Sequence, residues 1–254
     1  MSSLVLTLLL AQAGAPPSTP FRILDNSFLV EEAFNQERGV FQNIFGFTRV
    51  RAGEWEGTFT QEWPAPGMRH QFSYTLSWNA VQSRAAAGDA LVNYRVQVME
   101  EEDGRPAFAP RLSAIVPSGR QSTGGGNAGA QVNLPFSKRA GRMYFHWNGG
   151  VTWLPRNGRT DLVSPALAGS AIYALRPMFN LMLESALALE AGDTPAGRVE
   201  RTRSLTVAPG VRGGWNVMDD KQIVVGAALP ITRVNGDVST GVFAYFSYEL
   251  RFTR

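Results

Sequence analysis

Residues 69–79 read RHQFSYTLSWN, and large apolar side chains alternate there with polar ones. The apolar positions are Phe72, Tyr74, Leu76 and Trp78. Because successive side chains of a β-strand point to opposite faces, this stretch predicts a strand with one apolar and one polar face. The pattern returns along the chain with turn residues between its copies. It favours a transmembrane antiparallel up-and-down β-barrel of about 12 strands, an all-β fold.

The N-terminus has the features of a secretory signal peptide. A short apolar block at residues 4–10 precedes Ala11-Gln12-Ala13, which fits the small-x-small cleavage rule. We therefore expect a signal peptide over residues 1–13, with an apolar N-terminal strand or helix as the alternative. The block is shorter than the roughly 20 apolar residues of a spanning helix, and no later stretch reaches that length. A membrane location would thus require a barrel, which pairs every backbone group without an edge.

Composition agrees with a secreted, pore-forming chain. The mean hydropathy of the 254 residues is −0.11, the formal net charge is +3, and there are no cysteines. A chain without cysteine has neither a thiol nucleophile nor a thiolate metal site. Basic residues are dispersed among acidic ones, so no nucleic-acid partner is expected. We expect no cofactor either.

Residues 14–39 form a leader and a periplasmic N-terminal segment in this interpretation. Within residues 21–39, Asp25-Asn26-Ser27 can begin a helix and Gly39 can end it. The sequence predicts a short helix at the periplasmic end, which either plugs the lumen or lies beneath the rim. The barrel would occupy residues 40–254.

Twelve strands are expected in the barrel region. Their ranges are 40–51, 54–64, 68–80, 89–100, 107–116, 128–137, 142–154, 166–176, 178–190, 201–213, 221–231 and 240–253. Connections on one side are mostly longer than those on the other, and barrels of this class have short periplasmic turns and long external loops. Both termini should therefore lie in the periplasm.

Outward aromatic residues should form two girdles. The periplasmic girdle would contain Phe41, Trp63, Phe72, Phe108, Phe136, Phe179, Trp215 and Phe252, and the outer girdle Trp55, Trp78 and Trp153. Amphipathic rings favour those two levels. A soluble sandwich or lipocalin-like barrel with these rings in its core is the alternative, although twelve tilted strands are too wide to fill with apolar side chains.

Two stretches carry a resemblance to a known family. DNSFLVEEAFNQERGVFQNIF (25–45) and FTQEWPAPGMRHQFSYTLSW (59–78) resemble the outer-membrane channels called meta-pathway phenol degradation-like proteins, or simply transporters. The close resemblance covers roughly the first quarter of the mature chain. It implies a barrel of the bacterial outer membrane that passes small organic molecules, with membrane lipid and the barrel assembly machinery as partners.

Polar residues of the opposite parity should line the pore. The predicted pore-lining residues are Arg69, Asn93, Arg95, Gln97, Arg111, Gln131, Asn133, Arg142, Tyr144, His146, Asn148, Arg176, Glu184, Arg212, Glu249 and Arg251. Rings of arginine in a narrow pore favour anions, since the guanidinium is always charged. In the alternative interpretation these arginines pair with Glu56, Glu62, Glu184 and Glu249 and only hold the barrel's shape.

The leading functional hypothesis is a channel for passive passage of small solutes, which are small organic or anionic molecules. The alternatives are a closed structural barrel and a membrane-embedded hydrolase. His70 and His146 are the only histidines, and neither belongs to a recognisable nucleophile motif. The sequence therefore favours a protein that is not an enzyme.

Overall fold

The computed structural model describes residue 23 and residues 25–251, except 52–53, 82–83, 120–125, 195–196 and 218–220. The expected signal peptide, most of the leader and Phe252 thus lie outside the described residues. The described strands are β1 (Val40–Arg51), β2 (Glu54–Pro64), β3 (His70–Val81), β4 (Arg84–Ala87), β5 (Ala90–Val96), β6 (Ala107–Phe108), β7 (Arg111–Val116), β8 (Gly129–Ala140), β9 (Met143–Leu154), β10 (Leu162–Arg176), β11 (Phe179–Asp193), β12 (Val199–Asn216), β13 (Gln222–Ala228), β14 (Ile231–Val234), β15 (Asp237–Thr240) and β16 (Val242–Arg251).

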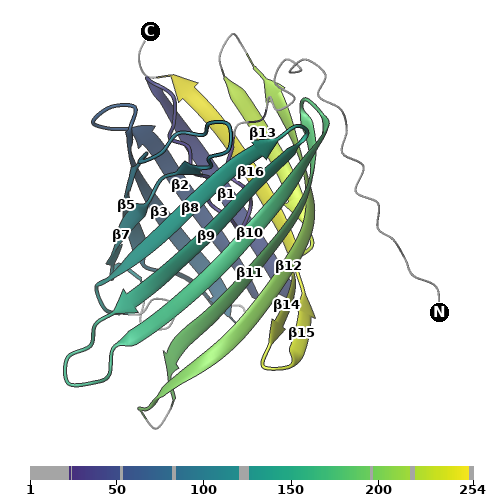
Figure 1. The fold of residues 1–254 in the computed structure, drawn as a ribbon. Helices are drawn as coiled ribbons and strands as arrows, with labels where there is room; N and C mark the ends of the chain where they lie inside the picture. The colour runs from purple at the N-terminus through teal and green to yellow at the C-terminus, as the bar shows by residue number, and fades with distance from the viewer. Residues whose placement is uncertain are drawn as a thin grey trace, which may run out of the picture.

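Twelve of these strands close into an antiparallel barrel (Figure 1). The order around the wall is β1-β2-β3-β5-β7-β8-β9-β10-β11-β12-β13-β16, and β16 pairs back with β1. The four short strands β4, β6, β14 and β15 extend the wall at its ends. The predicted fold class is confirmed. Closure leaves the main ladder without an unpaired edge, which is what a bilayer demands of strands.

The alternation in residues 69–79 determines inside and outside as expected. Leu76 and Trp78 are exposed on the outer face, whereas Gln71 and Ser73 are buried on the lumen side. Aromatic rings contact one another across neighbouring strands on the outer face: the ring centroids of Trp63 and Phe72 lie 5.0 Å apart. Such cross-strand aromatic pairs stabilise register in a sheet.

Two of the expected strands end early and are followed by short additional strands. The fourth expected strand ends early, because β5 stops at Val96 and residues 97–110 form a longer connection that contains β6. The expected strand 221–231 ends at Ala228, and the chain then makes the β14–β15 hairpin before β16. No helix in the described residues is long and apolar enough to cross a membrane.

Residues 25–39, here called the plug segment, run through the barrel lumen without regular secondary structure. The prediction of a helix in this segment is wrong. A helix would satisfy its backbone N–H groups internally, but the N–H groups of Leu29, Glu31 and Ala33 instead donate to side chains of the wall. The prediction left open whether this segment fills the lumen or lies beneath the rim, and the structure shows the former.

The buried apolar clusters lie between the plug segment and the inner wall. Ile23 and Phe28 pack with Val224, Phe243 and other inward residues of β12, β13 and β16. A second cluster joins Phe34 to inward side chains of β9, β10 and β11. The barrel's core is therefore a contact between the N-terminal part of the chain and the wall that follows it.

Candidate functional site: the barrel lumen and the plug segment

The carboxylate of Glu31 is the most highly coordinated group of the plug segment. Its two oxygens accept from Arg95 Nη1 at 3.1 Å and from Arg111 Nε at 2.8 Å. Asn133 Nδ2 donates to the same carboxylate at 2.7 Å, and Asn148 bonds both the backbone N–H and the carbonyl of Glu31. One residue of the plug segment is thereby tied to β5, β7, β8 and β9.

Burial by itself would raise the pKa of Glu31, but the guanidinium groups of Arg111 and Arg95 hold the pKa below its ordinary value. The carboxylate is therefore ionised at neutral pH, as two charge-assisted contacts require.

Arg95 holds a second part of the plug segment. It is 2% exposed and also donates to Asn35 Oδ1 at 3.1 Å, to the Glu32 carbonyl at 3.0 Å and to the Phe34 carbonyl. A guanidinium has five donors in a fixed planar arrangement, so one side chain can satisfy several carbonyls of an irregular chain at once.

A third group of contacts fixes the beginning of the plug segment. Asp25 accepts from Gln42 and from Tyr245 at 2.7 Å each, and also from Ser247. Arg212, which is fully buried, donates to the carbonyls of Asp25 and Asn26 at 2.9 and 2.8 Å. These contacts tie the segment to the opposite side of the wall, on β1, β12 and β16.

Phe28 occupies a socket whose floor is made of glycine. A Cβ added at Gly226 would lie 2.3 Å from the Phe28 ring, and one at Gly210 would lie 3.0 Å away. The ring also packs against Phe243 and Tyr245, with centroids 5.2 and 5.3 Å apart. The missing side chains on β12 and β13 therefore make the space that the Phe28 ring fills.

A cavity of about 240 Å³ adjoins the plug segment on the side of β1, β2 and β3. Hydroxyl groups of Thr58, Thr60, Ser73 and Thr75 line it, together with Glu62. Since a water molecule takes up about 30 Å³ in the liquid, the cavity has room for a small solute or several waters. The lumen is thus filled in part, with polar space left beside the plug segment.

The structure brings many of the predicted pore-lining residues together in the lumen. Those that contact the plug segment are Arg95, Arg111, Asn133, Tyr144, Asn148, Glu184 and Arg212. Asn93, Gln131 and His146 lie among them and bond to other wall residues. Gln97 bonds to the Met99 carbonyl at the end of the barrel where β1 begins, Glu249 is half-buried, and Arg69 and Arg251 are exposed there.

Arg142 and Arg176 are placed outside the lumen. Arg142 lies in the turn before β9, where it donates to the Ala174 carbonyl at 2.9 Å and covers the outward Tyr173 ring. A register shift between Ala174 and Arg176 ends the alternation of β10 one residue early. A shift of one residue moves a side chain to the other face of the sheet. Arg176 therefore lies on the outer face, although counting alternate residues along the strand predicts that it points inward.

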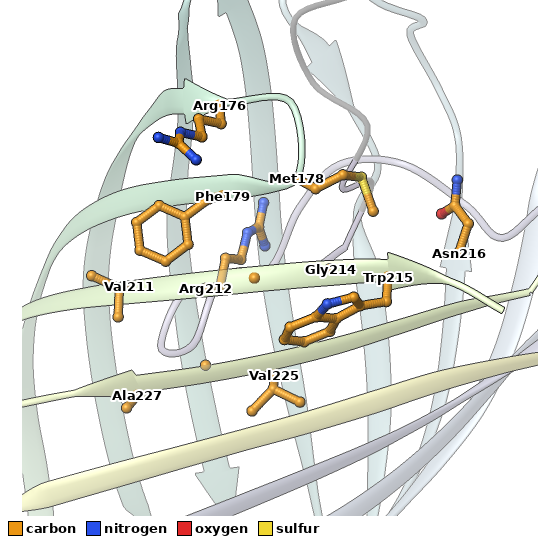
Figure 2. Close-up of a pocket in the computed structure, with 12 residues that line it drawn as sticks. Arg176, Met178, Phe179, Val211, Arg212, Gly214, Trp215, Asn216, Val225 and Ala227 are labelled. Carbon is orange, nitrogen blue, oxygen red and sulfur yellow. The ribbon is translucent and has the colours of Figure 1, made fainter.

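A cavity of about 640 Å³ lies on the outer surface of the barrel, at the end where β1 begins (Figure 2). Arg176, Phe179, Trp215 and Val225 surround it, and the Arg212 side chain extends from the same wall toward the plug segment. The exposed apolar side chains there face the region that lipid would occupy, so this cavity does not belong to the lumen site.

Sequence analysis missed the two acidic residues that organise the lumen. Both residues fall in the range predicted to be a helix, and the alternative interpretation paired the arginines with Glu56, Glu62, Glu184 and Glu249 instead. In the described part of the chain, both ion pairs of Arg95 and Arg111 are made to Glu31. The sequence signal that points to this role is the adjacent acidic pair Glu31-Glu32. If the segment enters the barrel, its buried charges need partners of opposite charge, and the predicted inner wall carries arginines.

Comparison with solved structures identifies the fold. No protein-family model and no curated protein matches the sequence. The COG4313 outer membrane channel from Pseudomonas putida F1 superposes with a TM-score of 0.68 at 10% identity, covering 87% of this chain and 98% of that one. The NanC porin superposes with a TM-score of 0.53 at 10% identity, covering 84% of this chain and all of that one. The chain therefore has the fold of bacterial outer-membrane channels.

Proposed function

We propose that the protein is a channel of the bacterial outer membrane for small solutes, and that the plug segment gates it. The main support for this proposal is the kind of contact that holds the plug segment in the lumen. Its contacts with the wall are side-chain hydrogen bonds, one charge cluster and apolar packing, whereas the barrel closes through the β1–β16 and β11–β12 ladders. The segment can therefore be displaced without breaking a strand pairing.

The charges of the lumen bear on which solutes would pass. Arg95 and Arg111 share the single Glu31 carboxylate, which balances one of their two positive charges. The acidic side chains of Glu62 and Glu184 are also buried on the inner wall. The lumen geometry thus supports passage of small solutes in general and gives no support to the finer prediction of anion preference. Assignment to the phenol degradation-like family also stays a prediction, because fold similarity at 10% identity does not identify a family.

A hydrolase is a weaker candidate, although the structure contains a serine–histidine contact. Ser137 Oγ and His146 Nδ1 lie 2.7 Å apart. Both residues are buried beneath the plug segment, and Ser137 Oγ already accepts from the Ala33 N–H. His146 Nε2 has no hydrogen-bond partner among the described residues, so the acid that orients a catalytic histidine is missing from its surroundings there.

A disulfide lock tests the gate. Ser27 and Ser170 bond through their hydroxyls at 2.7 Å, one from the plug segment and one from β10. Because the natural chain has no cysteine, Ser27→Cys/Ser170→Cys would create a single possible disulfide. In planar bilayers, the oxidised variant should show little conductance, and a reducing agent should restore the wild-type level.

The two single variants, Ser27→Cys and Ser170→Cys, serve as matched controls and should not respond to the reducing agent. Equal conductance of the oxidised and reduced double variant, with the disulfide verified by mass, would show that the segment does not move during conduction. Absence of conductance from the reduced variant and the wild type alike would favour the closed structural barrel.

A further inference from the structure

Exposed arginines gather on the outer face of the barrel near the β14–β15 hairpin. Arg203 lies on β12 and Arg233 on β14, and both side chains are exposed. The pairing of β12 with β14 sets Arg233 opposite Leu205, so Arg203 is its diagonal neighbour on the same face. Arg201, two residues before Arg203, shares that face. Figure 1 shows the hairpin beside β12, at the end away from the chain's C-terminus.

The position of these arginines along β12 corresponds to the outer boundary of the bilayer. Trp215 marks the periplasmic girdle, and ten residues separate it from Leu205 on the same outward face. At about 3.3 Å per residue and a tilt of about 40°, that distance spans about 25 Å, the height of the apolar band of such barrels. Arg203 is the next outward residue, just beyond the band.

Apolar side chains lie next to the arginines on the membrane side, and a hollow lies between Arg203 and Arg233. Leu205, Val207 and Ile231 are 42%, 39% and 44% exposed, as lipid-facing residues are in the absence of lipid. A hollow of about 380 Å³ is lined by Arg203, Leu205 and Arg233 and by the hairpin turn. That turn is Asn235-Gly236, with φ of 49° and 109°, the type of two-residue connection whose twist matches that of the flanking strands.

Neither Arg203 nor Arg233 makes an ion pair or a side-chain hydrogen bond within the described residues. The neighbouring acid, Asp237, pairs with Val234, whose side chain belongs to the opposite face of the hairpin. Two like charges at diagonal positions repel each other, and an anion between them removes that cost.

We propose that Arg203 and Arg233 form a binding site for a phosphate group of the phosphorylated glycolipid in the outer leaflet of the membrane. The guanidinium groups would bind the phosphate bidentately, and the lipid's acyl chains would cover Leu205, Val207 and Ile231. The site is independent of the lumen, so it goes beyond the channel function and does not depend on it.

The test measures binding of diphosphoryl lipid A to the purified barrel in detergent by native mass spectrometry. Arg203→Gln/Arg233→Gln should weaken binding by roughly 25-fold, on the basis of about fivefold for each arginine at an anionic membrane surface. The control, Arg38→Gln/Arg105→Gln, removes two exposed charges at the periplasmic end and should bind like the wild type. Gel mobility of heated and unheated samples verifies that each variant is folded.

Two further ligands separate the sources of binding. Lipid A with both phosphates removed should bind the wild type as weakly as the double variant binds the intact lipid, and inorganic phosphate alone should not compete. The proposal is overturned if the double variant binds intact lipid A like the wild type, or if the dephosphorylated lipid binds the wild type equally well. Competition by inorganic phosphate at low concentration would also overturn it, in favour of a site for the free ion.

Discussion

Replacing Glu31 with Gln should release the plug segment while keeping the size of the side chain. The substitution removes the charge that Arg95 and Arg111 contact at 3.1 and 2.8 Å, and it directs an NH₂ group toward guanidinium donors. Each hydrogen bond to a charged group contributes about 1.5–3 kcal/mol. The Glu31 side chain is 17% exposed, and because solvent weakens its contacts we take less than the sum of the two arginine contributions. We expect a loss of about 2–4 kcal/mol in the free energy that keeps the segment bound.

At about 1.4 kcal/mol per factor of ten, this loss raises the ratio of displaced to bound segment by about 30- to 700-fold. Single-channel recording in planar bilayers measures this ratio as the fraction of time spent in the open state. Glu37→Gln is the matched control, since Glu37 is exposed and precedes β1 outside the charge cluster. An open fraction of Glu31→Gln equal to that of the wild type, in a correctly folded barrel, would refute the role of this carboxylate.

Two other substitutions test the socket of the plug segment and the inside–outside assignment of the wall. Gly226→Ala should displace the Phe28 ring and raise the open fraction in the same recordings. The control is Gly192→Ala, whose new methyl group meets no atom within 4 Å and should leave the open fraction unchanged. A larger rise for Gly192→Ala than for Gly226→Ala would contradict the role of the socket. Leu76→Arg on the lipid face should cost about 2–4 kcal/mol in unfolding from lipid vesicles by urea, and Thr75→Arg on the lumen face should cost far less. Equal midpoints for the two arginine variants would mean that the faces are misassigned.

The alternation of residues 69–79 and its repeats determined the strand class, the approximate strand number and the outward face. These features depend on local geometry, because successive side chains of a strand point to opposite faces. Apolar residues at every second position therefore share one face, whichever strands lie beside them. The same parity identified Arg95, Arg111 and Arg212 as inward residues. It failed at Arg176, because the register shift at the end of β10 depends on pairing with β11 and has no signal in the strand's own residues.

Only the tertiary structure decided the conformation of residues 25–39. Local signals at Asp25-Asn26-Ser27 favour a helix start, because short polar side chains there can cap free N–H groups. In the closed barrel, wall residues from distant strands supply acceptors for those N–H groups, and Arg95 and Arg212 supply donors for the carbonyls. Satisfaction of backbone groups by residues 63 to 187 positions away overrides the local preference. The chemistry of the lumen, in which the Glu31 carboxylate pairs with two arginines, follows from that long-range arrangement.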